Sequence, residues 1–127
     1  MIGYTTVGAS DLKKSGEFYD KVFATVGAKR VMDFDTFTVW NTSEGGAGFS
    51  ITSPFNKEAP TVGNGVMMAI SAPDRATVDK MHATALAEGG TCEGKPGLRS
   101  EVSGFYAAYF RDLDGNKLNA FHLKSAS

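Results

Sequence analysis

The sequence lacks an excess of charge of either sign, and this absence excludes several kinds of partner. Its 13 basic and 14 acidic residues leave a formal net charge of −1. Proteins that attract nucleic acid or an anionic membrane surface normally carry a clear positive excess. We therefore expect neither nucleic acid nor a membrane as a partner.

Cysteine and long apolar runs are also scarce. The 127 residues include one cysteine, Cys92, which excludes an internal disulfide and a cysteine-cluster zinc site. No stretch approaches the roughly 20 apolar residues of a membrane-spanning helix, and the first residues lack the pattern of a secretion signal. These features predict a soluble, cytoplasmic protein.

The first half of the chain has the pattern of a β-α-β-β-β unit. Residues 2–9 favour a strand and lead into Ser10 and Asp11, which are good N-cap residues. Apolar residues then recur at helical spacing over 11–26, and Gly27 is typical of a helix C-terminal cap. Three short strands are predicted next, near 28–34, 35–41 and 47–53.

The second half repeats this order of elements. A strand at 65–71 leads to a helix that starts at Pro73 and ends at Gly89. A short strand near 90–93 and a long loop to Gly104 follow. Two final strands, 105–111 and 117–123, are joined by a hairpin that contains Asp-Gly, a strong turn signal. A shift of about 62 residues aligns the two halves, with Tyr4 on Val66.

We therefore expect a single domain over residues 1–127, produced by an internal duplication. Module 1 covers about 1–54, a linker rich in proline and glycine covers about 54–64, and module 2 covers about 65–123. Any α+β domain offers two helices among strands. The coincidence of strand, cap and stop signals in both halves favours the duplication.

Three motifs carry a resemblance to a known family: Ser10-Asp11-Leu12, Phe18-Tyr19-Asp20 and the hairpin segment 110–116 (FRDLDGN). With the repeated unit, they resemble the vicinal oxygen chelate superfamily of glyoxalases, bleomycin resistance proteins and dioxygenases. The hairpin is the most specific motif, although Leu113 replaces its usual proline. The resemblance implies an α+β fold of two tandem βαβββ modules that form an open, curved mixed sheet, the cup, with the helices outside.

The resemblance also implies a divalent metal in the cup, bound to two adjacent oxygens of the substrate. Its ligand positions transfer to Tyr4 (or Thr6 on the same face), Val66 and Asn119. Tyrosine and threonine are poor ligands here, valine has no donor atom, and a neutral amide lacks the charge that catalytic metal sites use. We therefore expect no metal and no other cofactor, with Fe, Mn, Ni or Zn as the alternative.

Histidines and glutamates elsewhere would have to converge to restore such a site. His122 lies an odd number of residues from Asn119 and should point to the opposite sheet face, and His82 lies on a predicted helix. Glu44 and Glu101 are the remaining candidates.

Without a metal, the cup has the composition of a neutral ligand pocket. Strand alternation and the hairpin place Tyr109 opposite Asn119 and Ala107 opposite Phe121. The predicted ligand-binding residues are Tyr4, Thr6, Trp40, Val66, Met68, Tyr109, Asn119 and Phe121. Core packing fits Trp40 and Met68 equally well, and Arg99 is either a carboxylate ligand or a solvated loop residue.

No catalytic residue is identifiable. An unshifted tyrosine, with a pKa of about 10, is a poor acid-base catalyst at neutral pH, and no histidine is recognisable beside Cys92. The leading hypothesis is a protein that binds a small organic ligand in its cup without a catalytic metal. The alternatives are a metal-dependent lyase, isomerase or dioxygenase with non-standard or dimer-shared ligands, and an interaction domain with a filled cup. A homodimer is possible because edge strands are exposed.

Overall fold

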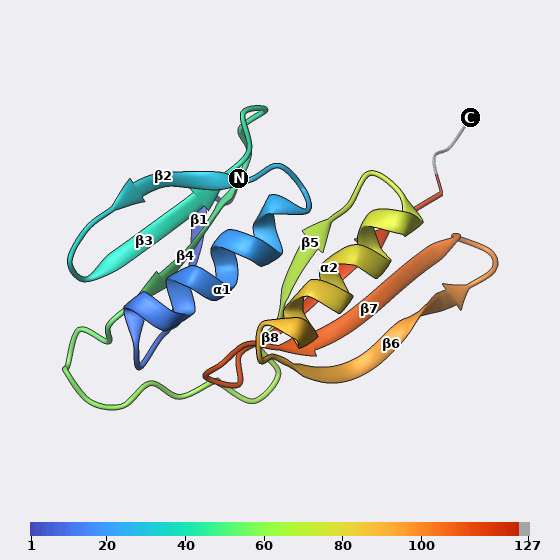
Figure 1. Cartoon of the computed structure of the whole chain (residues 1–127). Coiled ribbons are helices and arrows are strands. Elements are labelled where there is room, and N and C mark those ends of the chain that lie inside the picture. Colours follow the sequence, from blue (N-terminus) through green and yellow to red (C-terminus); the bar gives the residue numbers. More distant parts are fainter. Residues whose placement is uncertain (125–127) are drawn as a thin grey trace.

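The computed structural model describes residues 1–124 and has two successive βαβββ modules (Figure 1). Residues 125–127 of the predicted domain lie outside the described residues. The elements of module 1 are β1 (Tyr4–Gly8), α1 (Leu12–Ala24), β2 (Lys29–Asp33), β3 (Phe37–Asn41) and β4 (Gly48–Thr52). Those of module 2 are β5 (Met68–Ser71), α2 (Arg75–Ala87), β6 (Thr91–Ser100), β7 (Phe105–Arg111) and β8 (Lys117–His122).

Aspartate N-caps start both helices. The Asp11 carboxylate accepts a hydrogen bond from Lys14 N at 3.0 Å, and the Asp74 carboxylate accepts one from Thr77 N at 2.8 Å. Each bond satisfies one of the backbone donors that a helix start leaves without a partner. Pro73 therefore lies just before the cap of α2 and not at the first helical position, so it corresponds to Ser10 in module 1.

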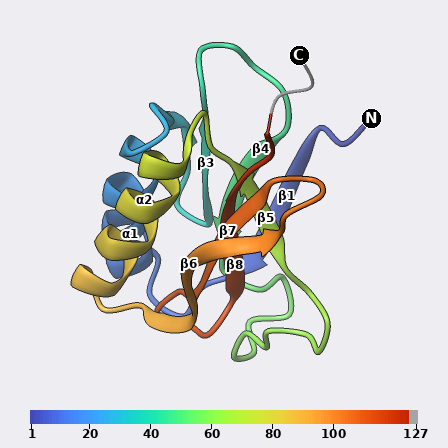
Figure 2. The same ribbon diagram turned by 90° about the vertical axis from the view of Figure 1, so that its right-hand side faces the viewer.

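Each module forms its own four-stranded mixed sheet. The strand orders are β1-β4-β3-β2 and β5-β8-β7-β6, with the first strand of each module parallel to the last and the other pairs antiparallel. Both helices lie on the same side of the strands, as Figure 2 shows. This arrangement confirms the α+β fold of two tandem βαβββ modules with open sheets and outer helices.

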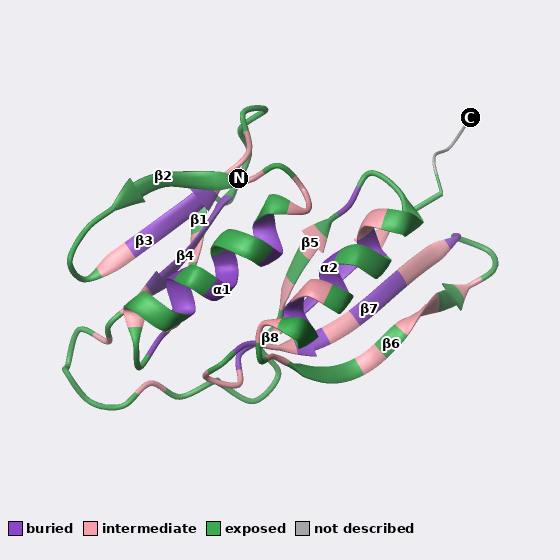
Figure 3. Cartoon of the chain, in the orientation of Figure 1, coloured by how far each residue is buried: buried purple, intermediate pink, exposed green. Residues whose placement is uncertain are grey.

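The core lies between the helices and the sheets. In module 1, Tyr19 and Phe23 of α1 pack against Trp40 and Phe49, and the Tyr19 and Phe49 rings are 4.7 Å apart between centroids. In module 2, the corresponding layer is aliphatic and includes Val78, Met81, Leu118 and Ala120, which are all fully buried. Figure 3 shows the buried faces of both helices turned toward the strands, and β2 exposed along the edge of its sheet.

Module 2 differs from the prediction in two strands. Residues 91–100 form the long strand β6 where a short strand and a loop were predicted. Three register shifts between β6 and β7 explain the difference, because bulges interrupt the two-residue alternation and accommodate Gly94 and Pro96 at a sheet edge. Strand β5 begins only at Met68, so Val66 lies in the preceding turn.

Both helices have 13 residues. Among the residues that the structure describes, no helix is long and apolar enough to cross a membrane.

Candidate functional site

The sheet face turned away from the helices corresponds to the predicted cup, and we call it the cup face. Trp40 and Phe49 pack against α1, so their strand neighbours Val39 and Ser50 point to the cup face. Tyr4 and Thr6 belong to the same face because Thr6 is the register partner of Ser50. The Thr6 and Ser50 hydroxyl oxygens are 2.8 Å apart in a hydrogen bond.

The cup face of module 2 carries Tyr109, Asn119 and Phe121. Strand β8 buries Leu118 and Ala120 in the core under α2, and alternation turns Asn119 and Phe121 the other way. Tyr109 pairs with Asn119 and Ala107 pairs with Phe121. The hairpin register predicted from the sequence is therefore confirmed.

Three predicted residues lie elsewhere. Met68 pairs with Leu118 and packs against the core, so it faces the helices and not the cup. Trp40 also faces α1, where its Nε1 donates a hydrogen bond to Asp20 Oδ1 at 3.0 Å. Val66 is 48% exposed in the turn before β5. The prediction counted alternate residues along single strands. It failed for Trp40 and Met68 because the pairing with neighbouring strands decides which alternate residues face the core.

The residues at the transferred ligand positions do not fit a divalent transition metal. Tyr4 is 66% exposed, Val66 has no donor atom, and Asn119 offers a neutral amide. The remaining histidines are held elsewhere, since His82 contacts Cys92 and His122 Nδ1 lies 3.0 Å from the Ala72 carbonyl oxygen. Within residues 1–124, no three His, Cys, Asp or Glu side chains are grouped to hold a metal ion.

Asn119 carries a buried polar atom without a partner on the cup face. Asn119 is only 2% exposed, and its Oδ1 atom has no hydrogen-bond partner among the described residues. A buried polar atom without a partner costs about 1–3 kcal/mol of stability. Native proteins usually satisfy such an atom, with water or a ligand where protein groups are missing.

Two cationic side chains lie beside Tyr109, the neighbour of Asn119. The Arg99 guanidinium carbon and the Lys117 Nζ atom are each 5.5 Å from the centroid of the Tyr109 ring. Arg99 also donates hydrogen bonds to the carbonyl oxygens of Lys95 and Ala107. Neither cation forms an ion pair in the described part of the chain. The Glu93 carboxylate near Lys117 is paired with Arg111, so Arg99 and Lys117 leave a local excess of positive charge here, although the net charge of the chain is −1.

The structure also reveals a cysteine and histidine pair that sequence reasoning missed. His82 Nε2 lies 3.3 Å from Cys92 Sγ, which corrects the expectation that Cys92 has no histidine beside it. Burial lowers the pKa of His82, and the nearby Asp79 carboxylate opposes this effect in part. The pair joins α2 to the start of β6, so neither helical nor strand spacing could reveal it.

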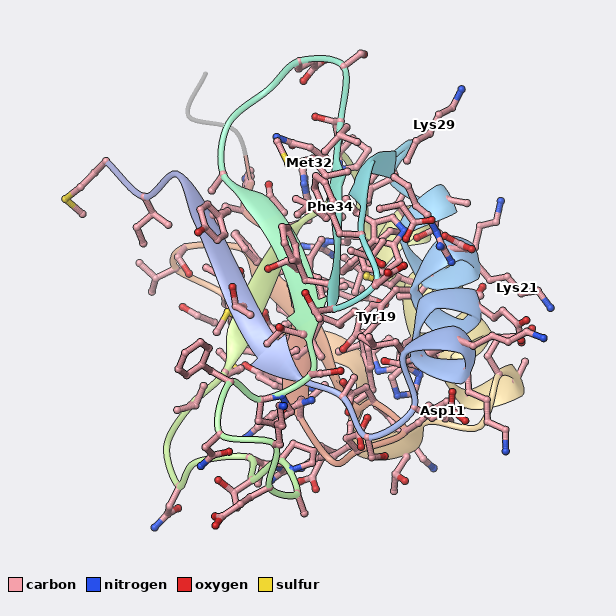
Figure 4. The ribbon with its side chains drawn as sticks, turned by 90° about the vertical axis from the view of Figure 1, so that its left-hand side faces the viewer. Asp11, Tyr19, Lys21, Lys29, Met32 and Phe34 are labelled. Carbon is pink, nitrogen blue, oxygen red and sulfur yellow. The ribbon has the colours of Figure 1, made fainter. Side chains whose placement is uncertain are left out.

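The hairpin motif at 112–116 has a structural role. The buried Asp112 carboxylate accepts hydrogen bonds from the Tyr19 hydroxyl at 2.6 Å and from the Asn116 side chain at 2.9 Å. Asn116 Nδ2 also donates to the Gly8 carbonyl oxygen at 2.9 Å. Figure 4 shows Tyr19 between α1 and the sheet. Burial and the Asp112 carboxylate raise the pKa of Tyr19 well above its usual value. The motif therefore fastens module 2 to module 1.

Comparison with known proteins agrees with this architecture. The family model of the Glyoxalase/Bleomycin resistance protein/Dioxygenase superfamily matches residues 1–120. The chain belongs to this superfamily. A superfamily protein from Albidiferax ferrireducens T118, a glyoxalase/bleomycin resistance protein, has a similar crystal structure with a TM-score of 0.85. The two sequences are 36% identical, and the match covers 96% of this chain and 98% of that one.

Two further solved structures share the fold at lower identity. A glyoxalase/bleomycin resistance protein/dioxygenase family enzyme from Burkholderia phytofirmans PsJN is 18% identical with a TM-score of 0.76, over 96% of this chain and 98% of that one. A lactoylglutathione lyase from Agrobacterium tumefaciens is 20% identical with a TM-score of 0.68, over 96% and 92%. No curated protein matches the sequence. The comparisons therefore establish the superfamily without a specific activity.

Proposed function

We propose that the protein binds a small organic ligand on the cup face of module 2 and that it does so without a resident metal or other cofactor. The observation that carries the proposal is Asn119, whose buried Oδ1 atom has no partner within the described residues. This oxygen is closed to solvent in the structure, so a ligand hydroxyl or N–H group would reach and satisfy it only after neighbouring side chains move aside. The stability lost by burying the oxygen would then be recovered on binding.

The surroundings of Asn119 indicate the chemistry of the ligand. Tyr109 supplies an aromatic ring and a hydroxyl group, and Phe105 and Phe121 lie nearby on the same strands with their ring centroids 5.7 Å apart. The cations of Arg99 and Lys117 favour an acidic group. The ligand class that fits these features is a small aromatic acid that also carries a hydrogen-bond donor.

The absence of a resident metal is proposed from the donor set. Tyr4, Val66 and Asn119 provide no anionic or imidazole ligand at the positions that the resemblance indicates. The alternative is a metal-dependent lyase, isomerase or dioxygenase, which would need non-standard ligands or ligands supplied by a second copy of the chain. Elemental mass spectrometry of the purified protein distinguishes the two, because the alternative requires nearly one Fe, Mn, Ni or Zn per site.

Titration with 4-hydroxybenzoate, followed by two-dimensional NMR, tests the binding proposal. We expect shift changes centred on Asn119 and Tyr109. Asn119→Leu should abolish binding, and Arg99→Gln should weaken it about 10- to 150-fold, since one charge-assisted contact contributes about 1.5–3 kcal/mol.

Arg75→Gln is the matched control for Arg99→Gln. Arg75 also stacks on a tyrosine, with its guanidinium carbon 5.1 Å from the Tyr106 ring centroid, but it lies on α2. Its replacement should leave the affinity unchanged. Equal affinity of the wild type and the Asn119→Leu variant would contradict the proposed site.

The association state is still a prediction. Strand β2 exposes Val31 and Met32 along a sheet edge, a position where a second chain can pair. Sedimentation velocity over a range of concentrations measures whether the chain forms the predicted homodimer.

A further inference from the structure

A cleft of about 620 Å³ lies between the two modules. It is bordered by the end of α1, the β3–β4 loop and the β5–α2 connection. Its walls are mainly apolar, with Phe23, Val26, Trp40, Phe49 and Ile70 among the lining residues. The volume falls within the range of about 300–1,000 Å³ that is usual for sites of small molecules.

The repeated architecture explains why this cleft is open. At the equivalent place in module 1, the hairpin of module 2 fills the space. Asp114 Oδ1 accepts hydrogen bonds from Ser10 N at 3.0 Å and from Ser10 Oγ at 2.6 Å. Asn116 adds the bond to the Gly8 carbonyl oxygen at 2.9 Å. One end of the molecule is therefore closed by its own chain.

The end of the molecule that contains the cleft lacks the hydrogen-bonding groups that close the opposite end. Pro73 occupies the position of Ser10 and has neither a backbone N–H nor a hydroxyl group. The β3–β4 loop, residues 42–47, has no aspartate or asparagine like those of the hairpin at 112–116. In the part of the chain that the structure describes, no hydrogen bond joins this loop to residues 71–74. The loop therefore faces module 2 across the cleft without being fastened to it.

The electrostatics of the cleft favour a cation. Among residues 1–124, Glu44 is the only charged residue that lines it. Val26 and Gly27 also line it and directly follow α1, so the partially negative end of the helix dipole borders the space. On the opposite wall, the Asp74 carboxylate caps the partially positive start of α2. Arg30, which stacks on Trp40, is neutralised by bidentate bonds to Asp20 at 2.8 and 2.9 Å.

We infer that the cleft is a second ligand site, which binds a small aromatic amine in its protonated form. The ring of the amine packs against the apolar walls of the cleft, and its ammonium group pairs with Glu44. This site differs from the proposed cup-face site in its residues and in the sign of charge that it selects.

The single tryptophan of the chain provides a direct assay, because Trp40 lines the cleft. Three probes of similar shape are titrated at neutral pH, and tryptophan fluorescence is followed: 2-phenylethylamine, neutral 2-phenylethanol and anionic 3-phenylpropanoate. We expect saturable binding of the amine at least tenfold tighter than that of the alcohol, and no measurable binding of the anion.

Two variants locate the site. Glu44→Gln should weaken amine binding about threefold, as expected for an ion pair at an exposed carboxylate, and leave binding of the alcohol unchanged. Glu17→Gln, at an exposed carboxylate on α1, is the matched control and should have no effect. Ala47→Phe fills the cleft from an exposed loop position and should abolish binding of both probes while the circular dichroism spectrum stays that of the wild type.

The inference is overturned if the amine does not bind, if it binds no more tightly than the alcohol, or if Glu44→Gln has no effect. Tighter binding of the anion would overturn it as well. Loss of amine binding in the Asn119→Leu variant would also contradict it, because that result would assign the amine to the cup face.

Discussion

Removal of the Asp112 carboxylate tests whether the 112–116 hairpin holds the two modules together. Four hydrogen bonds end on this carboxylate, from the Tyr19 hydroxyl, Asp114 N, Asn116 N and Asn116 Nδ2, at 2.6–2.9 Å. Asp112→Ala leaves these donors without their acceptor. Tyr19 is fully buried and Asn116 is 5% exposed, so water cannot readily replace the lost oxygen atoms.

The expected magnitude follows from the buried donors. Each buried group left without a partner costs about 1–3 kcal/mol, and neighbouring losses are not additive. We therefore expect Asp112→Ala to lower the free energy of unfolding by about 4 kcal/mol, out of a total of about 5–15 kcal/mol for a domain. Tyr19→Phe removes one bond and should cost about 1–2 kcal/mol.

Urea unfolding followed by circular dichroism measures both losses. Asp35→Ala, at an exposed carboxylate in the β2–β3 turn, is the control and should change stability by less than about 0.5 kcal/mol. A double-mutant cycle between Tyr19→Phe and Asp112→Asn should give a coupling energy of about 0.5–3 kcal/mol. The reasoning is refuted if Asp112→Ala costs less than about 1 kcal/mol or if the coupling is zero.

Three further measurements follow from the burial of single groups. Asn119→Leu should raise the free energy of unfolding by about 1 kcal/mol, because it removes a buried oxygen without a partner. Asn116→Leu should lower the free energy of unfolding, and urea unfolding compares the two variants. A loss of stability in Asn119→Leu would mean that Oδ1 is satisfied. The raised pKa of Tyr19 means that the unfolded chain loses this proton first above pH 10, so the wild type should lose stability relative to Tyr19→Phe between pH 9 and 11. A constant difference in unfolding free energy over that range would contradict the burial argument. The lowered pKa of His82 predicts an NMR titration midpoint below 6.5. The contribution of neutral His82 to stability should be present above pH 6.5 and lost as the pH falls through that midpoint. A midpoint at or above 6.5 would show that the effect of Asp79 outweighs that of burial.

Local interactions explain what the sequence determined by itself. The N-cap at Asp11, the turn at Gly27 and the Asp-Gly hairpin each depend on residues a few positions apart, so their chemistry is readable without the rest of the chain. The same local register placed Tyr109 opposite Asn119, which the structure confirms. Strand, cap and stop signals in both halves also predicted the βαβββ order, whereas the superfamily was inferred from the resemblance of three motifs.

Only the tertiary structure decided which groups meet over long separations. The orientation of Trp40 and Met68 depends on which strands pair and which side α1 and α2 cover, and single-strand alternation does not contain this information. Bulges hid β6 because they break the alternation by which a strand is recognised. The bond from Tyr19 to Asp112 spans 93 positions, and the open cleft depends on how one module docks against the other. Such contacts form only when the modules pack, so their chemistry cannot be inferred from local spacing.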